Sequence, residues 1–154
     1  MTVLYVAVVG PGEATAEEER TAEAVGRGLG AAGAYLVCGG LGGVMAAACR
    51  GALTHGGLSI GILPGSSREA ANPWVSVAVP TGLGELRNGL VVRAADAVIA
   101  VGGAYGTLSE VALALKTGVP VVGLSTWAIE GVKQAGDAHE AVTRALELAG
   151  RGRT

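Results

Sequence analysis

The chain has 154 residues, of which half are apolar and 16% are charged, and its formal net charge is −2. This length predicts a single domain over residues 1–154, and the apolar content excludes a disordered chain. The charge offers nothing to attract a nucleic-acid backbone, and no apolar run is long enough to span a membrane. We therefore expect a cytoplasmic protein that binds neither nucleic acid nor membranes.

Runs of apolar residues separate glycine-rich turns along the whole chain, in which 27 residues are glycine. Continuous apolar runs of strand length are typical of a parallel sheet that is covered on both faces. They predict about six strands, over residues 3–9, 34–38, 58–63, 74–79, 96–100 and 119–124. Helices are expected over residues 16–30, 44–53, 83–94, 108–116 and 139–149. Thr15 is the expected N-cap of the first helix. The fold class is α/β, with a mostly parallel sheet and helices on both faces.

The stretch from Val101 to Glu110 joins the fifth predicted strand to the helix that follows it. Its glycines allow backbone N–H groups to approach an anion, and the first turn of the helix adds unpaired N–H groups. A second interpretation also fits: Thr107 and Glu110 have the spacing of a capping box, which needs no ligand. In the helix itself, the apolar spacing predicts that Leu108, Val111, Ala112 and Leu115 face the core.

A second glycine cluster, Gly39–Gly43, follows the second predicted strand and precedes a helix rich in small residues. Close packing of that helix explains the cluster without a ligand. If the two strands are neighbours, however, both glycine loops face one crevice at the carboxyl edge of the sheet, where open α/β folds bind ligands. Arg87 is either a solvated residue of its helix or a cation for a phosphate or for Glu110.

Several other classes of site are disfavoured. The loop after the first strand is a weak dinucleotide fingerprint, because Thr15 stands where a third glycine belongs. Neither Lys116 nor Lys133, the only lysines, follows a glycine loop, so a nucleoside triphosphatase is not expected. Cys38 and Cys49 are eleven positions apart and are predicted to be buried free thiols. His55 and His139 lack metal-ligand spacing, and no metal is expected.

The motifs together resemble those of the LOG-like Rossmann family, which contains cytokinin-activating phosphoribohydrolases and proteins long called lysine decarboxylases. The resemblance covers roughly residues 3–125. It rests on Gly39–Met45, Ala71-Asn72, Pro80-Thr81-Gly82, Arg87-Asn88 and Gly102–Glu110. Asn88 replaces a lysine of those enzymes, and Ala104 replaces a glycine. The Arg-Asn pair is similar to that of a sister branch, the molybdenum cofactor carrier proteins.

The resemblance implies a Rossmann-like fold and a homodimer or homotetramer. It implies that the chain binds a small phosphorylated ligand, either the molybdenum cofactor or a nucleotide such as AMP, with no cofactor required. The alternative is a phosphoribohydrolase that cleaves nucleoside 5′-monophosphates to base and ribose 5-phosphate, with Arg87 and Glu110 as the catalytic pair. A lysine decarboxylase is rejected, because neither lysine lies where a pyridoxal phosphate Schiff base would form. The expected ligand-binding residues are Gly39, Gly40, Gly42, Gly43, Met45, Asn88, Gly102, Gly103, Ala104, Tyr105, Gly106 and Thr107, of which Tyr105 is the best candidate for stacking on a ring.

Overall fold

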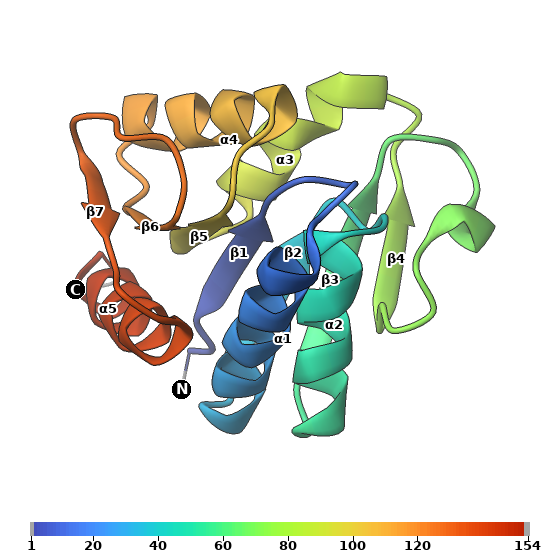
Figure 1. Ribbon diagram of the computed structural model, residues 1–154. Coiled ribbons are helices and arrows are strands. Elements are labelled where there is room, and N and C mark those ends of the chain that lie inside the picture. Colours follow the sequence, from blue (N-terminus) through green and yellow to red (C-terminus); the bar gives the residue numbers. More distant parts are fainter. Residues whose placement is uncertain (1, 153–154) are drawn as a thin grey trace.

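The computed structural model describes residues 2–152 and contains one sheet of seven parallel strands (Figure 1). The order across the sheet is β4-β3-β2-β1-β5-β6-β7. The strands are Tyr5–Val9 (β1), Tyr35–Cys38 (β2), Leu58–Leu63 (β3), Val77–Pro80 (β4), Ala97–Val101 (β5), Val121–Leu124 (β6) and Val132–Gln134 (β7). The α/β, Rossmann-like prediction is confirmed, but the predicted count of six strands is too low by one. The missed strand, β7, is a three-residue edge strand that carries only one apolar residue.

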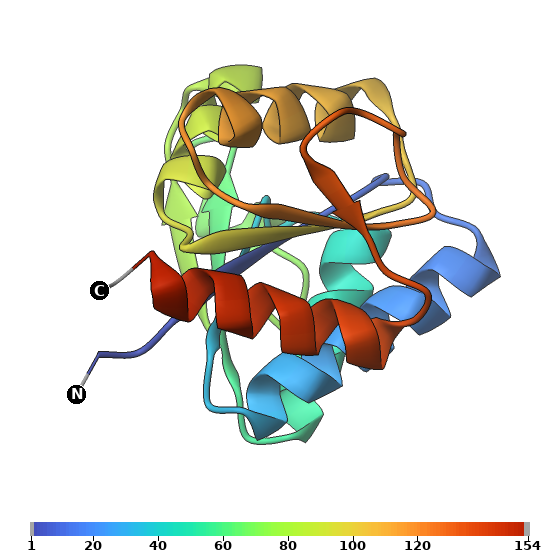
Figure 2. The ribbon, with the colours of Figure 1, turned by 90° about the vertical axis from the view of Figure 1, so that its left-hand side faces the viewer.

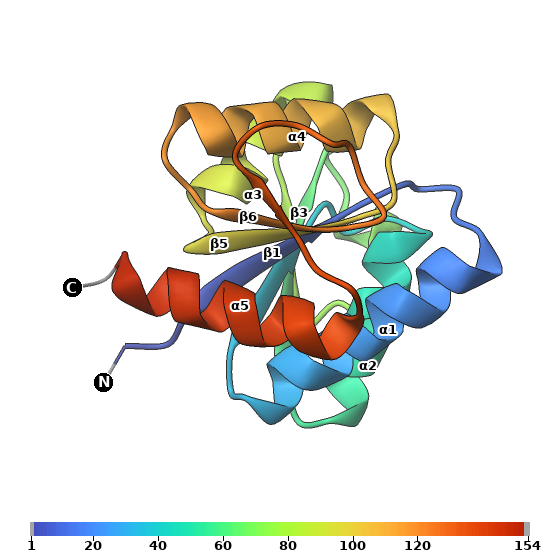
Figure 3. The ribbon, with the colours of Figure 1, turned by 60° about the vertical axis from the view of Figure 1, so that its left-hand side comes forward.

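Five α-helices cover the two faces of the sheet. They are Ala16–Ala31 (α1), Val44–Thr54 (α2), Asn88–Arg93 (α3), Tyr105–Lys116 (α4) and Ala138–Arg151 (α5). Helices α1, α2 and α5 lie on one face, and α3 and α4 lie on the other (Figures 2 and 3). Within residues 2–152, no helix combines the length and apolar character needed to cross a membrane.

The N-terminus of α1 has the side-chain cap that its sequence predicts. The Thr15 hydroxyl accepts a hydrogen bond from the Glu18 N–H at 3.1 Å, and the Glu18 carboxylate accepts one from the Thr15 N–H at 2.9 Å. This reciprocal pair is a capping box, which satisfies two backbone donors that the helix leaves unpaired.

The third predicted helix and the fourth predicted strand begin later than expected. The helix expected from residue 83 begins as a 3₁₀ turn, Gly84–Arg87, and only then becomes α3. Gly84 has a positive φ of 61°, which neither kind of helix contains, so regular helix cannot extend back through it. The fourth strand begins three residues later than expected. Residues before it are held by side chains instead, since the Trp74 N–H donates to Asn72 Oδ1 and the Trp74 carbonyl accepts from Ser59 Oγ.

Helices α1 and α2 pack backbone to backbone because glycines lie where they cross. A Cβ at Gly26 would overlap the carbonyl oxygen of Ala48, and a Cβ at Gly51 would overlap that of Glu23. The core on this face is built from small aliphatic residues such as Ala22, and the chain contains no phenylalanine. Short side chains and glycine contacts thus fix α2 firmly against α1.

The strand order reverses between β1 and β5. From β1 the chain builds outward through β2, β3 and β4, and it then returns to place β5 on the other side of β1. The loops after β1 and β5 consequently diverge, which opens a crevice at the carboxyl edge of the sheet. The two glycine loops follow β2 and β5. These strands are not neighbours, because β1 lies between them.

Candidate functional site

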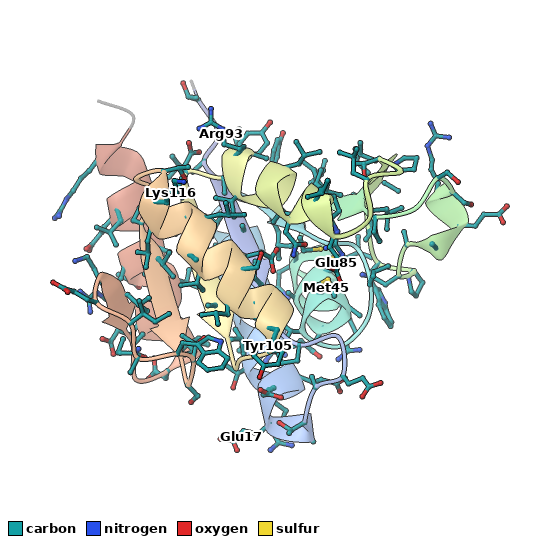
Figure 4. All side chains as sticks on the ribbon, turned by 90° about the horizontal axis from the view of Figure 1, so that it is seen from above. Glu17, Met45, Glu85, Arg93, Tyr105 and Lys116 are labelled. Carbon is teal, nitrogen blue, oxygen red and sulfur yellow. The ribbon has the colours of Figure 1, made fainter. Side chains whose placement is uncertain are left out.

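A cleft of about 330 Å³ opens at this reversal point. Loops after four strands, β1, β2, β3 and β5, meet there, and the 3₁₀ turn before α3 closes one side (Figure 4). The part of the lining that the sequence predicted is Gly39, Met45, Arg87, Asn88, Ala104, Gly106, Thr107 and Glu110. The rest is Val8, Val9, Gly10, Pro11, Gly12, Leu41, Pro64 and Glu85.

Three predicted residues of the second glycine cluster, Gly39–Gly43, lie outside this lining. Gly40 and Gly43 both have positive φ, of 78° and 63°, which explains why glycine stands at each. Gly43 lies against the loop after β1, where the Val44 N–H donates to the Pro11 carbonyl at 3.0 Å. Gly42 is exposed beside the same loop. These residues shape the loop, while Gly39 alone of its four predicted glycines lines the cleft.

Three predicted residues after β5 also lie outside the lining. Gly102, with a φ of 67°, faces the carboxylate of Glu18, and Gly103 faces the indole of Trp127. Tyr105 is 85% exposed at the start of α4. Its ring is thus solvent-facing beside the cleft, and stacking on a ligand ring stays a prediction.

Helix α4 begins at Tyr105, three residues before the predicted start, and it has no side-chain cap. The N-cap residue is Ala104, whose side chain has no acceptor atom, and the first N–H of the helix to bond back along it is that of Leu108, to the Ala104 carbonyl at 2.9 Å. The capping-box interpretation of Thr107 and Glu110 is therefore wrong. The first N–H groups of α4 have no intrahelical acceptor and lie at the cleft.

Thr107 and Glu110 instead lie on the buried face of α4. The fully buried residues of that face are Thr107, Glu110, Val111 and Ala114. The predicted core face is confirmed for Val111 and for Leu115, which packs partly buried against the core, and is wrong for Ala112, which is exposed, while Leu108 is half-buried. Thr107 is 1% exposed, and its hydroxyl has no hydrogen-bond partner within residues 2–152. A buried polar group without a partner is costly, so this hydroxyl is a natural contact for a bound ligand.

Glu110 lies at the floor of the cleft and is 8% exposed. Burial raises the pKa of its carboxyl group from 4.5 to about 7, although the positive charge of Arg87 acts in the opposite direction. The carboxyl group is therefore poised between its neutral and charged forms near neutral pH. Such a group can donate or accept a proton, or hydrogen-bond a ligand in either form.

Three acceptors hold the guanidinium of Arg87. Its Nε donates to the Ile62 carbonyl at 2.9 Å, Nη1 donates to Asn88 Oδ1, and Nη2 donates to the Gly39 carbonyl at 3.4 Å. These bonds use three of its five N–H donors. The remaining donors are available to a ligand in the cleft.

Arg87 and Glu110 line the same cleft, as the sequence predicted, but they do not form an ion pair among the described residues. Asn88, which is buried at the start of α3, orients Arg87 through its side-chain oxygen. The solvated-face interpretation of Arg87 is thus wrong, because its side chain is partly buried and three of its donors bond to protein acceptors.

Two features of the site were not among the predicted site residues. The loop Gly10–Gly12 lines the cleft because β1 is the strand next to the reversal, and a glycine-rich turn after the first strand was a usable signal. Asn72 anchors the second glycine loop: its side-chain amide donates to the Leu41 carbonyl at 2.9 Å, and its backbone N–H donates to the Gly40 carbonyl at the same distance.

Neither lysine lies at this site. Lys116 is at the opposite end of α4 from Tyr105 (Figure 4), and Lys133 is exposed on β7. Within residues 2–152, no group of three or more histidine, cysteine or acidic side chains is arranged to hold a metal ion.

These features define a Rossmann-like α/β protein with a ligand-sized cleft at the reversal point of its sheet. The chain belongs to the SLOG cluster4 family, whose model matches residues 3–149. A protein of uncharacterised function from Archaeoglobus fulgidus is 41% identical over 143 residues, which are 92% of this chain and 94% of the relative.

Two solved structures support the branch that the sequence resemblance indicates. The molybdenum cofactor binding protein of the phototrophic bacterium Rippkaea orientalis superposes with a TM-score of 0.91 at 35% identity, over 96% of this chain and 98% of that one. The molybdenum cofactor carrier protein of Chlamydomonas reinhardtii superposes with a TM-score of 0.87 at 31% identity, over 97% and 99% of the two chains.

Proposed function

We propose that the chain binds a small phosphorylated ligand, with its phosphate at the N-terminus of α4. The observation that carries this proposal is the pairing of an uncapped helix start with the buried, unpartnered hydroxyl of Thr107 at one side of the cleft. Free N–H groups and the positive end of the helix dipole attract an anion there. Arg87 adds a full positive charge to the same cleft.

The ligand is a nucleotide or a pterin phosphate such as the molybdenum cofactor. The similar structures from Rippkaea orientalis and Chlamydomonas reinhardtii are a molybdenum cofactor binding protein and a carrier protein, which supports this choice. The cleft volume lies near the lower end of the usual range for small-molecule sites. The raised pKa of Glu110 leaves part of that carboxyl group uncharged at neutral pH, which reduces its repulsion of an anion.

A comparison of AMP with adenosine tests this role, because the two differ only in the phosphate. A ligand that binds only the folded state increases the free energy of unfolding, by about 2.7 kcal/mol when its concentration is a hundred times Kd. The melting temperature rises as a result. We expect AMP to raise the melting temperature clearly more than adenosine does. If AMP is too small to fill the site, the molybdenum cofactor should produce this larger rise instead. Equal responses to AMP and adenosine, together with no response to the cofactor, would refute the phosphate site.

The second candidate function is phosphoribohydrolase activity, and the position of Glu110 favours it. A carboxyl group with a pKa of about 7 in a cleft is suited to general acid–base chemistry, and Arg87 could orient a substrate beside it. Chromatography of AMP after incubation with the protein tests for released adenine. Release that is lost in Glu110→Gln would establish the enzyme, and no release alongside AMP binding would establish a binding protein.

The predicted homodimer or homotetramer also remains a proposal. Leu86 is 79% exposed and Leu90 is 42% exposed, and both are close in sequence to the cleft residues Arg87 and Asn88, so apolar side chains are available for an interface there. Light scattering of the purified protein would give the oligomeric state directly.

A further inference from the structure

Two buried thiols lie in contact directly behind the cleft. Cys38 ends β2 and Cys49 lies on α2, and their sulfur atoms are 3.5 Å apart. Both residues are fully buried and have free thiols, as the sequence predicted. A disulfide has an S–S length of about 2.05 Å, so the two sulfurs need to approach by only about 1.5 Å.

Each thiol is close along the chain to a residue that lines the cleft. Cys38 immediately precedes Gly39, and the Gly40 N–H donates to the Cys38 sulfur at 3.3 Å. Cys49 lies one helical turn after Met45, which also lines the cleft. We propose that Cys38 and Cys49 are a modification site: they form a reversible disulfide that changes the shape of the cleft at Gly39.

The displacement falls on the β2 side because α2 is held in place. Glycine contacts fix α2 to α1, and the Arg50 guanidinium donates two hydrogen bonds to Glu23, at 2.9 and 2.6 Å. After Cys38 the chain enters the loop Gly39–Gly43, whose carbonyl groups accept hydrogen bonds from Asn72 and Arg87, so a shift of Cys38 is passed to those contacts. A shift of Cys38 toward Cys49 draws Gly39 with it, and the Gly39 carbonyl is an acceptor for Arg87.

The reaction needs an oxidant, for which a small hydroperoxide is suitable because the cleft gives it a route to the residues beside the thiols. The hydrogen bond from Cys38 lowers the pKa of Cys49, so Cys49 supplies the thiolate. Its sulfur attacks one peroxide oxygen and the O–O bond breaks, giving a sulfenic acid and water or an alcohol. The Cys38 sulfur then displaces the hydroxyl group, so that one S–S bond forms and a water molecule leaves. The two thiols lose two electrons and two protons, and the peroxide is reduced.

Mass spectrometry of the full-length protein after treatment with hydrogen peroxide tests whether the bond forms. We expect the mass of the protein to fall by two hydrogen atoms. Digestion should give a peptide in which Cys38 is linked to Cys49, and dithiothreitol should reverse both changes. The Cys49→Ser and Cys49→Ala variants should not lose this mass. Thiols that stay free, or that gain oxygen atoms without linking, would overturn the proposal even if neither variant folds.

The effect on the cleft is measured without any ligand, so its outcome does not depend on the proposed function. Amide resonances of Gly39, Gly40 and Met45 should shift between the reduced and oxidised protein. Resonances of Gly65, on an exposed loop outside the cleft, should not. A disulfide that leaves the cleft resonances unchanged would show that the bond does not reshape the cleft.

Discussion

The guanidinium of Arg87 occupies the space that a side chain at Gly39 would fill. A Cβ at Gly39 would lie 2.7 Å from Arg87 Nη2 and 2.9 Å from the Met45 sulfur. Glycine at this position therefore allows the arginine to lie over the loop and donate to its carbonyl group. The second glycine loop thus contributes to the site by leaving room for the side chain of Arg87, which comes from the 3₁₀ turn before α3.

Gly39→Ala should weaken ligand binding while preserving the fold. The backbone at Gly39 does not have positive φ, and the atoms in conflict are the ends of flexible side chains, so they can move. We expect AMP affinity to fall about tenfold, which is roughly 1.4 kcal/mol. Calorimetric titration measures the affinity. Gly65→Ala is the control, because its new Cβ meets no atom within 4 Å; equal affinity in the two variants would contradict the role of Gly39.

Glu110 should make the stability of the fold depend on pH. Because its pKa is raised from 4.5 to about 7, the folded state retains a proton in this window that the unfolded state releases. Its contribution to stability is therefore present below about pH 4.5 and is lost as the pH rises to 7. Glu110→Gln removes this loss. Urea unfolding should show the variant more stable than the native protein by about 2–3 kcal/mol at pH 8, and similar to it at pH 4.5.

A difference between the two proteins that is the same at both pH values would mean that Glu110 does not titrate in this window. The comparison is made as a difference, so other titrating groups that the two proteins share cancel.

Thr107→Val should reduce binding without reducing stability. The hydroxyl that it removes is buried and unpartnered, so its loss should raise stability by up to about 1 kcal/mol, whereas AMP affinity should fall about fivefold. Thr126→Val is a matched control, because Thr126 has the same kind of buried hydroxyl outside the cleft. Melting curves measure the stability of both variants, and titrations with AMP measure their affinity. A loss of affinity in both variants would argue against a specific contact at Thr107.

Gly26→Ala should destabilise the protein strongly. The added methyl group meets the Ala48 backbone, which cannot move without separating α1 from α2. Overpacking of this kind costs about 1–3 kcal/mol. Gly89→Ala, in α3, meets no atom within 4 Å and should be neutral or slightly stabilising. Urea unfolding compares the two, and similar stabilities would show that the helices are not packed through this glycine.

The sequence predicted most of the fold because its apolar runs are long and separated by glycine. The run Leu58–Leu63 became β3 without change, and Thr15 capped α1 as its spacing indicated. The short polar strand β7 gave no such signal. The strand order was not predictable either, because it depends on contacts between residues far apart in the chain, and it is this order that brings Gly10–Gly12 into the cleft.

The sequence predicted which residues belong to the site better than it predicted how they are arranged. The Thr107 to Glu110 spacing has two physical meanings, and only the position of the helix start decides between them. Because α4 begins at Tyr105, both side chains turn toward the sheet and become part of the cleft. The available signal was that the polar residues Thr107 and Glu110 have the spacing of a buried helix face. The apolar residues Leu108 and Leu115 obscured it, because they favoured a different face as the buried one.

The most direct test of the central claim is a titration of the isotope-labelled protein with inorganic phosphate, followed through its backbone amide resonances. If the phosphate site is at the start of α4, the N–H resonances of Tyr105, Gly106 and Thr107 should shift together and saturate. Resonances that stay in place in this turn while others move, or that do not move at all, would contradict the account.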